Sequence, residues 1–103
     1  MQTSPISRVV VIRNKQGLHA RPADQFARLA LTFSAKIDVI RDDRRIAATS
    51  PMDLLTLGAL PGTQLTIVAE GNDAQQAIEA LANLVENVFP QEDSEHEERP
   101  GED

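Results

Sequence analysis

The stretch "NKQGLHARPA", residues 14–23 of this 103-residue chain, connects a predicted strand to a predicted helix. Before it, the β-branched run "SRVVVI" (residues 7–12) predicts a short strand. After it, apolar residues recur at helical spacing and predict an amphipathic helix over about residues 20–33. His19 falls at this junction, at or beside the N-cap of the expected helix. The sequence therefore places an imidazole at the start of its first helix.

A hairpin and a short helix are predicted next. "KIDVI" (residues 36–40) alternates apolar and polar residues, as a half-buried strand does, and Ile46 is available to pair with it across the "RDDR" turn. In "TSPMDLLTLG", Ser50 stands as an N-cap, Pro51 at the first helical position and Asp53 at the third. We therefore expect a two-stranded hairpin followed by a helix of about two turns.

One more strand and one more helix complete the predicted elements. "TQLTIVAEG" (residues 63–71) has the composition and alternation of a strand. Asp73 is placed to cap the last helix. The apolar stripe of that helix consists of Ala77, Ile78, Leu81, Leu84, Val85 and Val88.

The predicted order β-α-β-β-α-β-α indicates one fold class. Three amphipathic helices each need an apolar partner, and a half-polar antiparallel sheet offers one apolar face. We therefore predict an α+β fold, an open-faced β-sandwich in which a four-stranded antiparallel sheet carries three helices on one face.

Charge divides the chain into two parts. The formal net charge is -6, and residues 90–103 hold seven of the sixteen acidic residues but one of the ten basic ones. This last segment, "PQEDSEHEERPGED", has no apolar residue to bury, and its carboxylates repel one another. We therefore expect a folded domain over residues 1–89 and a disordered acidic tail over residues 90–103.

Composition excludes several classes of function. Cysteine is absent, which removes disulfides, thiolate metal sites and cysteine nucleophiles. Three Phe without Trp or Tyr, together with the negative charge, argue against nucleic-acid binding. No apolar run is long enough to span a membrane, and no secretory signal is visible, so we expect a cytoplasmic protein without membrane insertion. We also expect a monomer without cofactor or metal.

The surroundings of His19 favour an anion on its ring. The backbone amides of Ala20 and Arg21 open the helix without intrahelical partners, and the guanidinium of Arg21 matches phosphate geometry. These positive groups disfavour a cationic ring, and a neutral imidazole is a nucleophile that can take up a phosphoryl group. A metal site would need a second ligand beside His19, and the sequence places none there. A general base would need a hydroxyl or thiol partner, which is also absent beside His19 in the sequence.

Three stretches carry a resemblance to a known family. "GLHARPA" (residues 17–23) resembles the active-site motif of the histidine-containing phosphocarrier protein HPr of the phosphoenolpyruvate-dependent phosphotransferase system. "SPMDLLTLG" looks like the family's regulatory-serine helix, and "VAEGNDAQQAIEAL" resembles the family's turns of the "AAEGND" type. The likeness covers roughly residues 7–89, and the family fold is the open-faced sandwich predicted above.

The resemblance implies a function and its residues. His19 matches the histidine that is phosphorylated on Nδ1 by enzyme I and passes the phosphoryl group to an enzyme IIA component. Arg21 matches the arginine that steadies the phosphate and contacts partners. Such a protein is a carrier and a substrate of its partner enzymes in sugar transport, and is not itself an enzyme.

Further contacts are implied outside that motif. Ser50 matches a serine that HPr kinase/phosphorylase modifies in many family members, which makes that enzyme a candidate partner. Pro51 and Asp53 depart from the usual family pattern, and Asp53 would repel a phosphate on Ser50. Met52 is the expected exposed apolar contact, and Arg28 could add positive potential for acidic partners.

Two alternatives to the carrier stay open at this point. In the first, the chain is a regulatory interaction module, and its phosphorylation state at His19 or Ser50 controls partner binding without sugar transport. In the second, it is a small metal- or ligand-binding α+β domain in which His19 is idle. Without any function, a histidine at a helix start is usually a cap or an exposed surface residue.

Overall fold

The computed structural model describes residues 4–97 of the chain, with side chains through residue 93. Its elements follow the predicted order and add a helical extension at the end. They are β1 (Ile6–Val11), α1 (Ala20–Leu31), β2 (Lys36–Arg41), β3 (Arg44–Ala47), α2 (Pro51–Thr56), β4 (Gln64–Glu70), α3 (Ala74–Asn83), the π-helical turn η1 (Leu84–Val88) and α4 (Phe89–Glu97).

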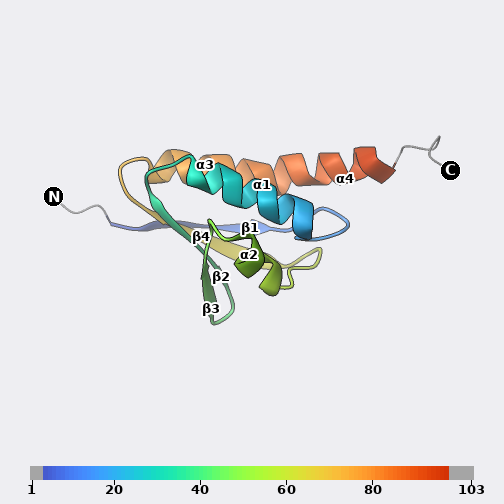
Figure 1. The fold of residues 1–103 in the computed structure, drawn as a ribbon, viewed down its shortest axis with the longest axis horizontal. Coiled ribbons are helices and arrows are strands. Elements are labelled where there is room, and N and C mark those ends of the chain that lie inside the picture. Colours follow the sequence, from blue (N-terminus) through green and yellow to red (C-terminus); the bar gives the residue numbers. More distant parts are fainter. Residues whose placement is uncertain (1–3, 98–103) are drawn as a thin grey trace.

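The strands form one antiparallel sheet in the order β1-β4-β2-β3 (Figure 1). The predicted hairpin is confirmed, because β2 pairs with β3 and Val39 lies opposite Ile46. Along β4 every second residue is buried, as the alternation predicts, and these residues are Leu65, Ile67 and Ala69. The sheet therefore has one apolar face.

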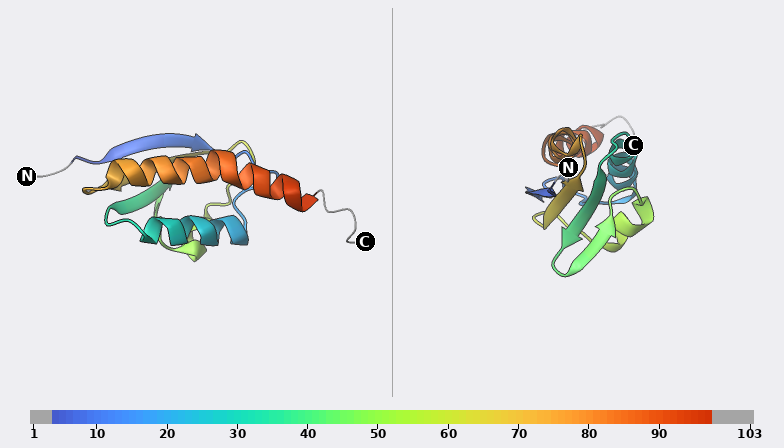
Figure 2. Two further views of the ribbon diagram at one scale, coloured as in Figure 1. Left: turned by 90° about the horizontal axis from the view of Figure 1, so that it is seen from above. Right: turned by 90° about the vertical axis from the view of Figure 1, so that its left-hand side faces the viewer.

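The helices cover that face and leave the other open (Figures 1 and 2). The buried side of α1 includes Ala23 and Phe26, and that of α3 includes Ile78 and Leu81. Both sides belong to one core with the apolar residues of the strands. The predicted open-faced α+β sandwich is confirmed. Within residues 4–97, no helix combines the length and the apolar character that crossing a membrane requires.

The helix ends follow local chemistry, with one difference from expectation. Ser50 caps α2 as predicted, because its hydroxyl accepts a hydrogen bond from the Asp53 amide at 3.2 Å. Asp73 occupies the N-cap position of α3, but its side chain does not cap that helix. It accepts instead from the amides of Ser34 and Ala35, at 2.8 Å each. The carboxylate therefore joins the start of α3 to the turn between α1 and β2.

The end of the chain differs from the predicted tail. We expected residues 90–103 to be disordered, and the structure corrects this for residues 90–97, which continue the helical rod of α3 as α4 (Figure 2). The turn before Pro90 is widened, since the amide of Phe89 donates to the carbonyl of Leu84. A proline inside a helix clashes with the preceding turn, and a π-turn relieves that crowding. Residues 98–103 lie outside the described part of the chain.

Candidate functional site

His19 opens α1 without capping it. Its backbone is extended, with φ −91° and ψ −169°, and its side chain makes no capping hydrogen bond. The first bond of the helix runs from the amide of Ala23 to the carbonyl of His19. The imidazole is therefore at the predicted N-cap position and is free to face away from its own helix.

Gly17 brings the loop before His19 close to another segment. Its φ is +70°, and a Cβ there would lie 2.5 Å from the carbonyl oxygen of Ala59. That oxygen accepts a hydrogen bond from the amide of Leu18 at 2.9 Å. The loop thus packs backbone against backbone on the connection between α2 and β4, and only glycine fits at this position.

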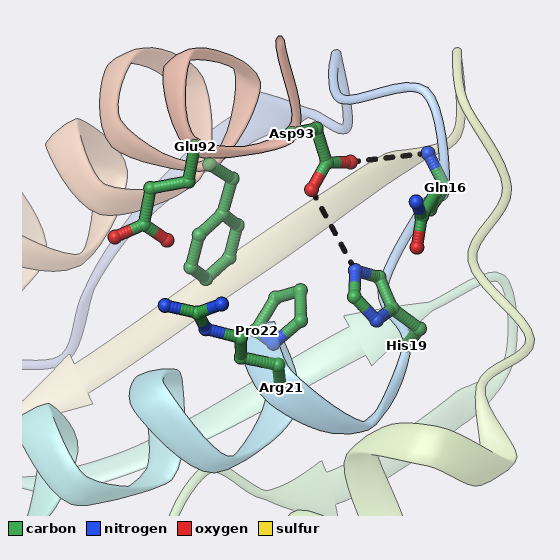
Figure 3. A pocket seen from close by; sticks show the side chains of 7 residues that line it. Gln16, His19, Arg21, Pro22, Glu92 and Asp93 are labelled. Carbon is green, nitrogen blue, oxygen red and sulfur yellow. Dashed lines mark hydrogen bonds and ion pairs between the residues drawn. The ribbon is translucent and has the colours of Figure 1, made fainter. Parts of the chain in front are cut away.

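His19 borders a pocket of about 120 Å³ between the start of α1 and the helix α4 (Figure 3). A volume of this size holds a few water molecules or a small anion. The lining residues come from the loop before α1, from α1 itself and from α4. They are Gln16, His19, Arg21, Pro22, Phe89, Glu92 and Asp93.

Asp93 joins α4 to the loop that carries His19. One carboxylate oxygen, Oδ2, accepts hydrogen bonds from the amide of Gln16 at 3.1 Å and from Nδ2 of Asn14 at 3.0 Å. The other, Oδ1, lies 3.7 Å from Nε2 of His19 (Figure 3). Asp93 is only 8% exposed. A buried carboxylate therefore faces one defined nitrogen of the imidazole.

The two ring nitrogens of His19 have different surroundings. Nε2 is buried and makes no hydrogen bond to any described residue, and the carboxylate of Asp93 is the charge that faces it. The side chain as a whole is 34% exposed. Because Nε2 points inward, Nδ1 is the nitrogen left to meet a molecule that arrives from solvent.

The start of α1 supplies positive character to the same pocket. The amides of Ala20 and Arg21 precede the first intrahelical hydrogen bond, and Pro22 has no amide hydrogen. The exposed side chain of Arg21 lines the pocket and extends toward the side where Glu92 lies (Figure 3). The site therefore combines a nucleophile, an arginine and a helix N-terminus, the groups that attract a phosphoryl group.

The other predicted site residues do not line this pocket. Ser50 and Met52 lie at the start of α2, and Met52 is 73% exposed, as expected for a contact residue. Arg28 lies on the exposed side of α1 and pairs with Asp24 at 2.7 Å, a hydrogen bond that raises the pKa of Arg28 further above its usual value. Its charge is therefore already shared with an acid on the same helix.

Sequence reasoning missed the contribution of α4, which includes Phe89, Glu92 and Asp93. A signal was present, since Val85, Phe89 and Asp93 follow one another at intervals of four residues. All three are buried. Such spacing places residues on one side of a helix, so Phe89 continues the apolar stripe of α3 and Asp93 lies on the same side one turn later. The high acid content of the segment hid this pattern.

An open-faced sandwich that presents a partly exposed imidazole beside an arginine at a helix N-terminus defines a class of protein, the histidine phosphocarriers. The family model described as the PTS HPr component phosphorylation site matches residues 6–87. The chain therefore belongs to the HPr family.

Individual relatives agree with this assignment. The phosphocarrier protein HPr of Mycoplasma capricolum is 42% identical over 71 residues, which cover 69% of this chain and 80% of that protein. The HPr-like protein Crh of Bacillus subtilis is 37% identical over 81 residues, 79% of this chain and 95% of that protein. The crystal structure of an HPr from Bacillus anthracis matches with a TM-score of 0.77 and 37% identity, covering 81% of this chain and 99% of that one. The chain is a phosphocarrier of the phosphotransferase system.

Proposed function

We propose that His19 is the residue that carries the phosphoryl group, on Nδ1. Phosphorylated enzyme I would supply the group, and an enzyme IIA component of the sugar phosphotransferase system would receive it. The protein acts in the cytoplasm, as a monomer and without turnover of its own. It is a substrate of its two partner enzymes, and the chemistry needs no cofactor beyond the group that is carried.

The orientation of the imidazole carries this proposal. Nε2 is buried against Asp93, whereas the ring remains partly exposed at the start of α1. Nδ1 is therefore the accessible nucleophile. A phosphoryl group bonded to it lies near the amides of Ala20 and Arg21, where the helix end favours negative charge. The imidazole needs no second ligand or base to act in this way.

Arg21 is proposed to steady the carried group. Its guanidinium lines the same pocket as the imidazole, and its planar set of donors can bind two phosphate oxygens at once. Because the side chain is exposed, it can also contact an approaching partner. Replacing Arg21 with Lys keeps the charge but removes the paired donors.

Phosphorylation from phosphoenolpyruvate tests the assignment of His19. Incubation with phosphoenolpyruvate and enzyme I is expected to add one phosphoryl group, and phosphorus NMR identifies it as a phosphoimidazole. The His19→Ala variant should take up none, whereas His96→Ala, which removes the other histidine of the chain, should label like the wild type. Labelling of His19→Ala, or its loss in His96→Ala, would refute the assignment.

The partner surface is proposed to include Met52 and Arg28. Met52 is largely exposed on α2, which packs beside α1. An exposed apolar side chain next to a reactive site is typical of a docking contact. We expect Met52→Asp to slow transfer from enzyme I while leaving the fold intact. An equal rate for Met52→Asp and wild type would remove Met52 from this surface.

A regulatory role is the second candidate, because an HPr-like protein Crh is among the relatives. Ser50 is the residue we propose for it, as a substrate of HPr kinase/phosphorylase. Its hydroxyl currently caps α2 and accepts from the amide of Asp53, whose carboxylate opposes added negative charge. Intact mass after incubation with ATP and the kinase decides the point. A mass gain that disappears in Ser50→Ala supports this role, and no gain excludes it.

A further inference from the structure

Asp93 lies beyond the part of the chain that matches the family model, which ends at residue 87, yet its carboxylate faces the imidazole. We propose that Asp93 is a positioning residue for phosphoryl transfer. It holds the proton of His19 on Nε2, so that Nδ1 presents its lone pair to the incoming phosphorus. This inference rests on the proposed role of His19 as the phosphoacceptor.

The position of the carboxylate is fixed independently of the imidazole. Oδ2 accepts from the amide of Gln16 and from Nδ2 of Asn14, and the same Nδ2 donates to the carbonyl of Gly17 at 2.7 Å. Asn14 is 1% exposed, and both of its amide partners are acceptors, so its orientation is determined. Oδ1 is thereby left directed at Nε2.

The separation of 3.7 Å between Oδ1 and Nε2 is longer than a hydrogen bond. At this distance the attraction between a carboxylate and an N–H group, or a positively charged ring, is still appreciable in a partly buried site. Nε2 is itself buried and forms no hydrogen bond within the described residues, so a proton on it faces this carboxylate. A proton is thus favoured on Nε2 over Nδ1.

The proposed transfer step exchanges one bond to phosphorus for another. The lone pair of Nδ1 forms a bond to phosphorus, the bond between phosphorus and the donor atom of the partner breaks, and its electron pair leaves with the donor. The proton on Nε2 stays in place. The product ring carries phosphorus on Nδ1, hydrogen on Nε2 and a positive charge, which Asp93 offsets. A cationic ring leaves phosphorus more readily than a neutral one, so the group remains transferable.

The other charged side chains of the pocket are Arg21 and Glu92. Glu92 is the residue next to Asp93 on α4, but its side chain points elsewhere in the pocket (Figure 3). It supplies a matched control, because Glu92→Gln and Asp93→Asn each remove one carboxylate from the same helix and the same pocket. If charge alone mattered, the two variants would behave alike.

Asp93→Asn should reverse the tautomer that the imidazole of His19 prefers. The amide of Gln16 and Nδ2 of Asn14 both donate to this position, so a carboxamide must turn its oxygen to them and its NH₂ group to His19. An NH₂ group that faces Nε2 favours a lone pair on that nitrogen and thereby the proton on Nδ1, the nitrogen that must be free. Exchange of a carboxylate for an amide beside a histidine imposes the wrong tautomer in this way.

Nitrogen-15 NMR identifies the tautomer of the neutral imidazole of His19. A purely structural role of Asp93 would leave that tautomer unchanged in the folded protein. We expect the Nε2–H tautomer in the wild type and in Glu92→Gln, and a shift toward Nδ1–H in Asp93→Asn. The initial rate of phosphorylation by enzyme I should fall about tenfold or more in Asp93→Asn and stay within about twofold in Glu92→Gln. Circular dichroism checks that each variant is folded.

The outcomes separate the two proposals. A wild type that accepts no phosphoryl group on His19 refutes the proposed function, and this inference with it. Normal labelling of wild type and of Asp93→Asn, with the same tautomer in both, overturns the role of Asp93 alone. Should Asp93→Asn fail to fold, the wild-type tautomer decides. A proportion of Nε2–H above that of free histidine supports the inference, and a proportion at or below it overturns the inference.

Discussion

Gly17→Ala tests how the loop before His19 is held. Alanine at the observed φ of +70° costs about 1–2 kcal/mol relative to glycine. Its Cβ would also lie 2.5 Å from the carbonyl oxygen of Ala59, so one of the two backbones must move. Such overpacking costs about 1–3 kcal/mol, and moving that oxygen strains its bond to the amide of Leu18. We therefore expect the free energy of unfolding to fall by about 2–5 kcal/mol.

Gly58→Ala separates the conformational cost of a positive φ from the cost of the close backbone contact at Gly17. The φ of Gly58 is +62°, almost the same as that of Gly17, but the nearest atom to an added Cβ is Nη1 of Arg41 at 3.8 Å, an ordinary contact. This variant should lose only the conformational part, about 1–2 kcal/mol. Urea unfolding followed by circular dichroism measures both. Equal losses in the two variants would refute the argument from close backbone approach.

Three further substitutions test individual contacts of the fold by the same unfolding measurement. Ser50→Ala removes the cap of α2 and should cost about 1 kcal/mol, and no loss would show that water replaces the cap. Asp73→Ala leaves the amides of Ser34 and Ala35 without their acceptor and should cost about 1–3 kcal/mol, whereas a change below about 0.5 kcal/mol would argue against this link. Phe89→Ala should cost about 3–5 kcal/mol, because the ring is 1% exposed, and a surface-like effect would contradict its burial.

The elements that could be predicted are those with a local signal. Burial along β4 follows its alternating sequence, and the start of α2 follows from Ser50, Pro51 and Asp53, because an N-cap and a helical proline act over one turn. The place of His19 at the N-cap of α1 follows from the change in period between residues 7–12 and 20–33. These signals lie within a few residues of the structure that they specify.

The parts that could not be predicted depend on distant residues. Asp73 satisfies amides 38 and 39 residues earlier in the chain instead of its own helix, and this competition between partners has no local signature. Asp93 meets Asn14 across 79 residues. Its segment has the composition of a solvated tail, and composition averages over the side of the helix on which each acid lies. Only the packing of α4 against the loop selects one acid from the series.

In the proposed function, Asp93 of α4 and the start of α1 act in opposite directions on the phosphoryl group, and a carrier needs both. Free amides and Arg21 are proposed to stabilise the bound group. Stabilisation without limit would trap it, since a group must bind less strongly before transfer than during it. Asp93 adds negative charge to the same pocket and would reduce that stabilisation. The carboxylate of Asp93 faces Nε2, whereas the proposed phosphoryl group is on Nδ1, so this carboxylate would also offset the charge of the phosphorylated ring. One helix can therefore limit the binding of the phosphate and keep the ring that carries it reactive.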